Sequence, residues 1–173
     1  HGDHCFGLLG LISTLNLLGR TAELHIHSPK GLETLLAPML SFFCRQMTYK
    51  VLFHEFETKE PGMIYEDRSL TVTTIPLRHR MPCCGFLFAE KQRPNHIIRE
   101  MVDFYEVPVY ELNRIKNGED YVNPEGKIIS NSLLTRPSDP PRSYAYCSDT
   151  IYVPGIAEQI KGCLLYTSPS PRD

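Results

Sequence analysis

The first fourteen residues read HGDHCFGLLGLIST (1–14) and place two imidazoles and a carboxylate directly before an apolar stretch. Apolar residues then recur at the spacing of a helix with one buried face, at Leu8, Leu11, Ile12, Leu15 and Leu18. Gly19 is placed to end that helix. His1, Asp3 and His4 therefore lie in a loop at the start of a helix, and zinc favours such nitrogen and oxygen donors. A solvated polar turn is the alternative for this spacing by itself.

The rest of the chain continues a β/α alternation and then becomes richer in strands. Residues 22–28 alternate like a strand, and 31–47 predict a helix in which Pro38 forces a kink or a break. We expect the next strands to form a meander, at 50–57, 70–77 and 85–90, with 58–69 as a connection. Helices at 95–105 and 109–116, turns at 117–118 and 123–126, a Pro-rich loop at 137–142 and a buried strand at 143–147 complete the prediction.

The composition is that of one globular domain. Among 173 residues, 42% are hydrophobic and 22% are charged, which is enough apolar material for a core. A formal charge of -2 means that any contact with nucleic acid depends on local patches. The six cysteines show neither a disulfide framework nor paired CxxC units, so we interpret them as reduced thiols of a cytosolic protein. No stretch is long and apolar enough to cross a bilayer.

Both ends of the sequence are unusual. The chain has no initiator Met and opens inside the histidine motif, so we expect a reading frame truncated at its 5′ end. Residues 163–173 turn polar and Pro-rich and resemble translated adaptor sequence, so we expect a non-native tail that packs against nothing. The native domain is then predicted to span 1–162.

Two further motifs follow the first one along the chain. Residues 76–88 (PLRHRMPCCGFLF) carry His79 where a predicted strand ends, and a turn and a glycine-led strand come after it. Residues 146–150 (YCSDT) carry Asp149 where another predicted strand ends. Taken by itself, Asp149 is as readily a helix or turn cap.

Together, the three motifs resemble ribonuclease Z in order, spacing and intervening sequence over nearly all of 1–162. The family's first motif is HxHGDHxxGLPGL, of which the chain lacks the first histidine and has Leu9 in place of the proline. The resemblance implies a partial αββα metallo-β-lactamase sandwich of the α/β class. It also implies two zinc ions per complete subunit, one held by His1, His79 and Asp149 and the other by Asp3, His4 and the same Asp149. Asp3 would also act in catalysis by orienting the nucleophile.

The activity implied by the resemblance is that of a hydrolase, an endoribonuclease that removes 3′ trailers from precursor tRNA with a metal-bridging hydroxide. A cytoplasmic homodimer is the expected assembly. Because one further ligand of each metal and the proton donor are absent from the sequence, we expect the chain by itself to be inactive. Alternatives are another phosphodiesterase of the same fold and a catalytically dead fragment that binds RNA or a partner.

Several other residues have competing interpretations. His25 and His27 mimic an HxH ligand pair but match no motif of the family, and His54 and His96 are interpreted as surface residues. The adjacent pair at 83–84 would chelate one zinc poorly, so packing at a turn is the preferred interpretation. Residues 104–126 stand where the family carries a tRNA-binding arm but lack its Gly-Pro signature. Candidates for RNA phosphate contacts are Arg78, Arg80, Lys91, Arg93, Arg114 and Lys116.

Overall fold

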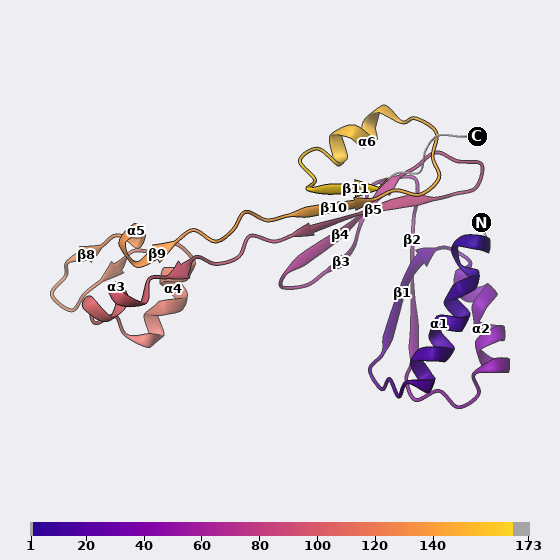
Figure 1. Ribbon diagram of the computed structural model, residues 1–173, viewed down its shortest axis with the longest axis horizontal. Coiled ribbons are helices and arrows are strands. Elements are labelled where there is room, and N and C mark those ends of the chain that lie inside the picture. The colour runs from indigo at the N-terminus through magenta and orange to yellow at the C-terminus, as the bar shows by residue number, and fades with distance from the viewer. Residues whose placement is uncertain (1, 168–173) are drawn as a thin grey trace. The chain divides into compact units, whose positions relative to one another are not determined.

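The computed structural model describes residues 2–167, without the side chain of Asp3 (Figure 1). Within these residues the chain forms two compact units. The first unit comprises residues 2–66, 71–88 and 143–167, and the second comprises 67–70 and 89–142. The sequence predicted a single domain over residues 1–162. The two units describe how the chain packs and do not test that prediction, so it stays a prediction.

The first unit begins with a β-α-β arrangement preceded by a helix. The 3₁₀ helix η1 (Gly2–His4) leads into α1 (Phe6–Leu17), and β1 (Leu24–Pro29), α2 (Leu32–Phe43) and β2 (Val51–Phe56) follow. Strands β1 and β2 pair in parallel, with Leu24 opposite Val51. Both helices and this pair of strands share one core, whose buried residues are Ile12, Leu36, Leu40 and Tyr49.

Two details of the helices differ from the prediction. The helix α2 runs unbroken through Pro38, because Leu36 and Leu40 on either side of the proline are both buried in the core. Their burial offsets the backbone hydrogen bond that proline cannot donate. On α1 the predicted apolar face is wrong at Leu11 and Leu18, which are mainly exposed, while Leu9 packs against the core.

A five-stranded sheet forms the remainder of the first unit. Its strand order is β11-β10-β5-β4-β3, and the members are β3 (Met63–Glu66), β4 (Leu70–Pro76), β5 (Cys84–Glu90), β10 (Ser143–Tyr146) and β11 (Leu165–Thr167). The predicted meander is therefore wrong in one member, since the strand at 50–57 pairs with β1 instead. The prediction also missed β3, which lies within the supposed connection 58–69 and pairs antiparallel with β4.

The segment from about residue 164 onward was predicted to pack against nothing and to have no regular structure, and the second part is wrong for its described residues. Leu165–Thr167 form β11, which pairs in parallel with β10. The amide of Leu164 donates to Ser143 O (2.9 Å), and that of Cys147 donates to Thr167 O (2.8 Å). Backbone groups make these bonds whatever the side chains are, and Leu164, Leu165 and Tyr166 remain exposed. Residues 168–173 lie outside the described part of the chain.

The second unit is a small helix-and-hairpin assembly. Its elements are β6 (His96–Ile97), α3 (Arg99–Phe104), η2 (Val109–Glu111), α4 (Leu112–Lys116), β7 (Tyr121–Val122), β8 (Ile128–Ile129), α5 (Asn131–Leu134) and β9 (Thr135–Arg136). They enclose a separate core centred on Ile115 and Leu134, both fully buried. The turn at 117–118 is as predicted, with Gly118 at φ 100°. The helix predicted at 95–105 begins only at Arg99, because β6 pairs with β9 first.

The mixture of helices with parallel and antiparallel strands confirms the predicted α/β class. Over the described residues, the longest helices are too short to span a bilayer, and none has the required apolar length.

Candidate metal centre

Two loops of the first unit meet where the sheet strands β4 and β10 end. Strand β4 ends at Pro76 and β10 at Tyr146, and each strand is followed by one of the predicted motifs. The amide of Arg78 donates to Thr150 Oγ1 (3.1 Å), and the amide of Ile151 donates to Arg78 O (2.9 Å). These bonds hold the segment before His79 against the segment that follows Asp149.

A glycine on the neighbouring strand β5 makes this close packing possible. A Cβ atom added at Gly85 would lie 2.6 Å from the carbonyl oxygen of Tyr146 and 3.2 Å from the Sγ of Cys147. Such a contact is far inside van der Waals distance, and its nearest atom belongs to backbone. The sequence CCGF of residues 83–86 therefore has its glycine where β5 passes directly against the end of β10.

The third motif reaches the same place from the other end of the chain. His4 closes η1, and its Nε2 lies 3.4 Å from Oδ2 of Asp149. Both side chains are a little under half exposed, at 45% and 44%. Sequence reasoning predicted that these two residues approach one another, and they do. Their role as metal ligands stays a prediction.

The remaining predicted ligands are placed less completely. His79 is half-buried and directly follows the bonded Arg78. His1 and the side chain of Asp3 lie outside the described residues. Among the side chains that the structure does describe, no three of His, Cys, Asp or Glu are grouped closely enough to hold a metal ion.

The adjacent cysteines lie beside this pair, and their chemistry is that of thiols. Cys83 Sγ donates to the backbone oxygen of Asp149 (3.4 Å), and burial together with the charge of Asp149 raises the pKa of Cys83. Burial raises the pKa of Cys84 to about 12. Because zinc binds the thiolate, these shifts favour the packing interpretation of the two cysteines.

The other histidines of the predicted alternatives lie on strands. His25 and His27 lie on β1 and His54 on β2, where the rings of His25 and His27 each stack on the ring of His54. His96 lies on β6 in the second unit. Their exclusion from the ligand set stays a prediction.

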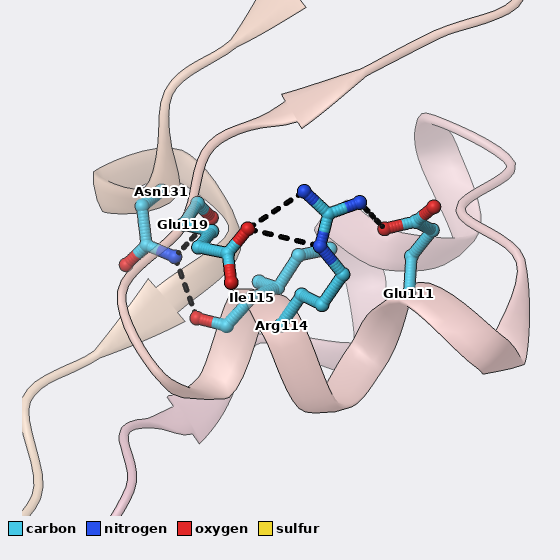
Figure 2. A network of polar contacts seen from close by, with 5 residues as sticks. All are labelled: Glu111, Arg114, Ile115, Glu119 and Asn131. Carbon is cyan, nitrogen blue, oxygen red and sulfur yellow. Dashed lines mark hydrogen bonds and ion pairs between the residues drawn. The ribbon is translucent and has the colours of Figure 1, made fainter.

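The candidate phosphate-binding residues divide between the two units. Arg78 and Arg80 are exposed on the loop after β4. Arg114 already pairs with two carboxylates, since its guanidinium donates to Glu119 Oε2 at 2.7 and 2.9 Å and to Glu111 Oε2 at 3.1 Å (Figure 2). These bonds raise the pKa of Arg114 above its ordinary value, and the two carboxylates already compensate the charge that the guanidinium would offer a phosphate.

A basic pocket in the second unit brings two of the candidates, Arg93 and Lys116, together with Arg99 and Arg136, which the sequence analysis did not single out. It encloses about 640 Å³, and its lining comprises Arg93, Pro94, Asn95, His96, Ile97, Arg99, Leu112, Lys116 and Arg136. Four of these side chains are cationic and none is acidic. Arg93 and Arg99 have acidic partners outside the lining, Glu90 and Asp103. Within residues 2–167, neither Lys116 nor Arg136 forms an ion pair. The helix α4 and the pairing of β6 with β9 gather these cations, a proximity that sequence spacing does not reveal.

The fold and the site thus define an α/β protein in which a histidine and an aspartate from distant loops meet beside a sheet. No family model matches the chain. It is 79% identical over 162 residues to ribonuclease Z of Bacteroides thetaiotaomicron, covering 94% of this chain and 51% of that protein. Identity is 76% to ribonuclease Z of Bacteroides fragilis (94% and 53% covered) and 50% to that of Porphyromonas gingivalis (96% and 55%).

The resemblance to ribonuclease Z predicted from the three motifs is confirmed by these identities. The chain spans about half the length of the curated relatives that it matches. Among solved structures, human tRNase Z, short form, matches with a TM-score of 0.46 and 25% identity, over 54% of this chain and 43% of that one.

Proposed function

We propose that the chain is part of a ribonuclease Z, an αββα metallo-β-lactamase-fold hydrolase that removes 3′ trailers from precursor tRNA. The observation that carries the proposal is the approach of His4 to Asp149, 3.4 Å apart, in a chain up to 79% identical to ribonuclease Z. The two residues belong to the first and third motifs, and the loop of the second motif is hydrogen-bonded beside them. Sequence similarity and side-chain placement thus support the same centre.

The donor atoms of this pair suit zinc. Two atoms bound to one tetrahedral zinc at about 2.0–2.1 Å lie roughly 3.3 Å from each other. The distance of 3.4 Å between His4 Nε2 and Asp149 Oδ2 matches that edge, and it is longer than a strong charged hydrogen bond. Partial exposure of both side chains gives a metal ion and a substrate access to them.

The resemblance to ribonuclease Z implies the rest of the ligand set. Asp149 is proposed to bridge two zinc ions, with His4 and Asp3 on one and with His1 and His79 on the other. Zinc bound there would lower the pKa of a water molecule and stabilise the charge that develops on the phosphodiester. Asp3 would orient the attacking water. The hydrogen bonds from Arg78 and Ile151 would keep the loops of His79 and Asp149 in register while the substrate binds.

The RNA is proposed to contact the basic pocket of the second unit. Lys116 and Arg136 line this pocket without an ion-pair partner in the described chain, so their charges are available to phosphates. A local basic pocket reconciles RNA binding with a chain whose formal charge is -2. Arg78 and Arg80 offer a second set of exposed cations on the loop beside Asp149.

The complete protein is proposed to be a cytoplasmic homodimer. Large apolar side chains are exposed near the ends of α1 and α2, with Leu17 at 83% and Phe43 at 69%. Such exposure is costly in water and is typical of surfaces that another subunit covers. Light scattering of the full-length protein measures the assembly directly.

The deciding experiment uses the full-length gene product, because this chain covers about half of its relatives. Trailer release from a precursor tRNA is measured beside hydrolysis of bis-nitrophenyl phosphate, with and without zinc. Ribonuclease Z activity predicts zinc-dependent trailer release that is lost in Asp149→Ala and retained in the matched control Asp139→Ala, because Asp139 is exposed and belongs to no proposed site. Hydrolysis of the small diester without trailer release would instead indicate another phosphodiesterase of the same fold. An inactive full-length protein with zinc bound would overturn the proposal.

A further inference from the structure

Three imidazoles lie together on one face of the β1–β2 pair, outside the candidate metal centre. His25 and His27 alternate along β1 with Leu24 and Ile26, which pack into the core of α1 and α2. His54 on β2 is directly opposite His27 in the parallel register. Because Leu24 and Ile26 face the core, the three imidazoles lie on the opposite, outward face of the two strands.

The three rings form a continuous stack. His25 Nδ1 and His54 Nε2 are hydrogen-bonded at 2.8 Å, and these two rings are nearly parallel, with 11° between their planes. The ring of His27 stacks on that of His54, with centroids 4.7 Å apart. His54 thus contacts both of the other rings.

The hydrogen bond between His25 and His54 limits how many protons the stack can hold. The bond needs an N–H on one ring and a lone pair on the other. A neutral pair and a singly protonated pair both meet this condition, because one nitrogen can still accept. When both rings are protonated, both nitrogens carry hydrogen, so the bond is lost and two cations face one another.

The surroundings favour a single proton. Glu23, just before β1, has its Oε2 3.9 Å from His25 Nε2, so a proton on His25 would face a carboxylate. On β3, Tyr65 presents its ring edge-on to His27 at 6.2 Å and brings no negative charge. The other nearby acid, Glu55 on β2, accepts a hydrogen bond from the amide of Gly31 (2.8 Å).

His27 has its own reason to stay neutral. Burial lowers the pKa of His27 from its ordinary value, and the charges of His54 and then His25 lower it further. A second proton entering the stack must therefore reside on a ring that contacts an already charged one.

We propose that the stack of His25, His27 and His54 acts as an acid-sensitive lock on the β1–β2 pair. The stack holds one proton, and it opens, losing the hydrogen bond between His25 and His54, when a second proton binds. Histidine is the side chain suited to such a transition, because its ordinary pKa lies just below neutrality. The lock acts on the strands that carry the core under α1 and α2, so its opening loosens that part of the first unit. The inference is independent of the catalytic proposal, since it concerns none of the predicted metal ligands.

The test is amide hydrogen exchange of the intact chain between pH 7.5 and 5, corrected for the intrinsic pH dependence of exchange. Protection in β1 and β2 is expected to fall by up to about tenfold per pH unit for each additional proton bound on opening. Protection in α4, in the second unit, serves as the internal reference. His54→Gln retains an amide that can hydrogen-bond but carries no charge, so its protection should vary less than about threefold over the same range. His96→Gln should behave as the unsubstituted chain.

Imidazole titration by NMR of the unsubstituted chain provides a second measurement that needs no variant to fold. The titration curves of the three stacked rings should depend on one another, because a proton on one ring acts on the ring that it contacts. Protection in β1 and β2 that does not change with pH would overturn the proposal. An equal acid-induced loss in His54→Gln would also overturn it, as would independent titration of the three rings.

Discussion

His4 Nε2 lies 3.4 Å from Asp149 Oδ2, although the two residues are near opposite ends of the described chain. Neither residue is held there by its own neighbours alone. His4 is positioned by η1 at the start of α1, and Asp149 by a loop anchored at the end of β10 and bonded to Arg78. The pair therefore reports on the correct folding of the whole first unit, and variants on either side probe its chemistry.

Replacing Asp149 with asparagine tests the pair as a metal site. The substitution keeps the shape of the side chain and removes its charge. Loss of a direct ligand is expected to weaken zinc binding by at least about 10–100-fold, because substitutions in outer shells already have effects of this size. The measurement is competition with a chromophoric chelator, using full-length protein. His96→Gln provides the control. Unchanged zinc affinity in Asp149→Asn would remove Asp149 from the ligand set.

Substitution of Gly85 tests the close approach of β5 to β10. The added Cβ of Gly85→Ala would lie 2.6 Å from Tyr146 O, so backbone must move. We expect a loss of roughly 1–3 kcal/mol in the free energy of unfolding, as for other overpacked cores. Gly10→Ala is the matched control, because nothing lies within 4 Å of its Cβ on α1. Alanine there should stabilise the helix by about 0.5–1 kcal/mol. Urea denaturation that ranks the two variants in the opposite order would contradict the structure.

The side chain of Asn131 should contribute more to the free energy of unfolding than the ion pairs of Arg114 shown beside it in Figure 2. Its Nδ2 donates to the backbone oxygens of Ile115 (2.6 Å) and Glu119 (2.8 Å). Asn131→Ala leaves these acceptors without their donor, which we expect to cost roughly 1–3 kcal/mol. Arg114→Ala removes only exposed pairs and should cost less than about 1 kcal/mol. Thermal unfolding of the two variants under one buffer condition compares them, and equal losses would refute the ranking.

Alkylation rates test the state of the cysteines. With its pKa raised to about 12, Cys84 is expected to be only about 0.01% thiolate at pH 8 and to react very slowly with iodoacetamide. Cys5 and Cys44 are partly exposed and should be modified first. The rate at Cys84 should still rise about tenfold per pH unit up to pH 10, provided that the fold persists. Peptide mass spectrometry resolves the sites. Rapid labelling of Cys84 at pH 8 would mean that this thiol is not buried as described.

Charge-removing variants of Lys116 and Arg136 test the basic pocket. If each contacts one RNA phosphate, removal of one charge should reduce the slope of log affinity against log salt by about 0.7–0.9. The weakening should be similar for unrelated RNA sequences, because phosphate contacts carry no base information. Arg114→Gln is the control, since that guanidinium is already paired with Glu111 and Glu119. Full-length protein and a precursor tRNA at several salt concentrations give the slopes.

Local patterns predicted most of the longer elements of the first unit. The spacing around Ile12 indicated α1, and alternation around Ile26 indicated β1, because each repeats one period over several residues. Short elements were missed. The strand β3 has four residues, and α6 (Pro154–Gln159) has six, so neither offers enough sequence for a period to show.

Pairing was harder to predict than the strands themselves. The strand at 51–56 was expected beside its successors in sequence, but α2 carries it back to β1 as a parallel partner. Proximity of His4 and Asp149 followed only from the order of three motifs and not from any periodicity. The basic pocket was not predicted, because its cations come from the segment before β6 and from α3, α4 and β9, and their meeting depends on tertiary packing.

The pairing of β11 with β10 has a consequence for solubility. Three residues with outward, largely apolar side chains occupy the margin of the sheet, and the contacts described between the two strands are mainly those of the peptide backbone. The edge of β10 binds its neighbour through peptide groups and so discriminates poorly between sequences. It would pair with an extended segment of another molecule as readily as with Leu165–Thr167. Pairing with β11 therefore removes β10 from the edge and makes β11, with Leu165 and Tyr166 exposed, the strand at which intermolecular addition is expected at high protein concentration.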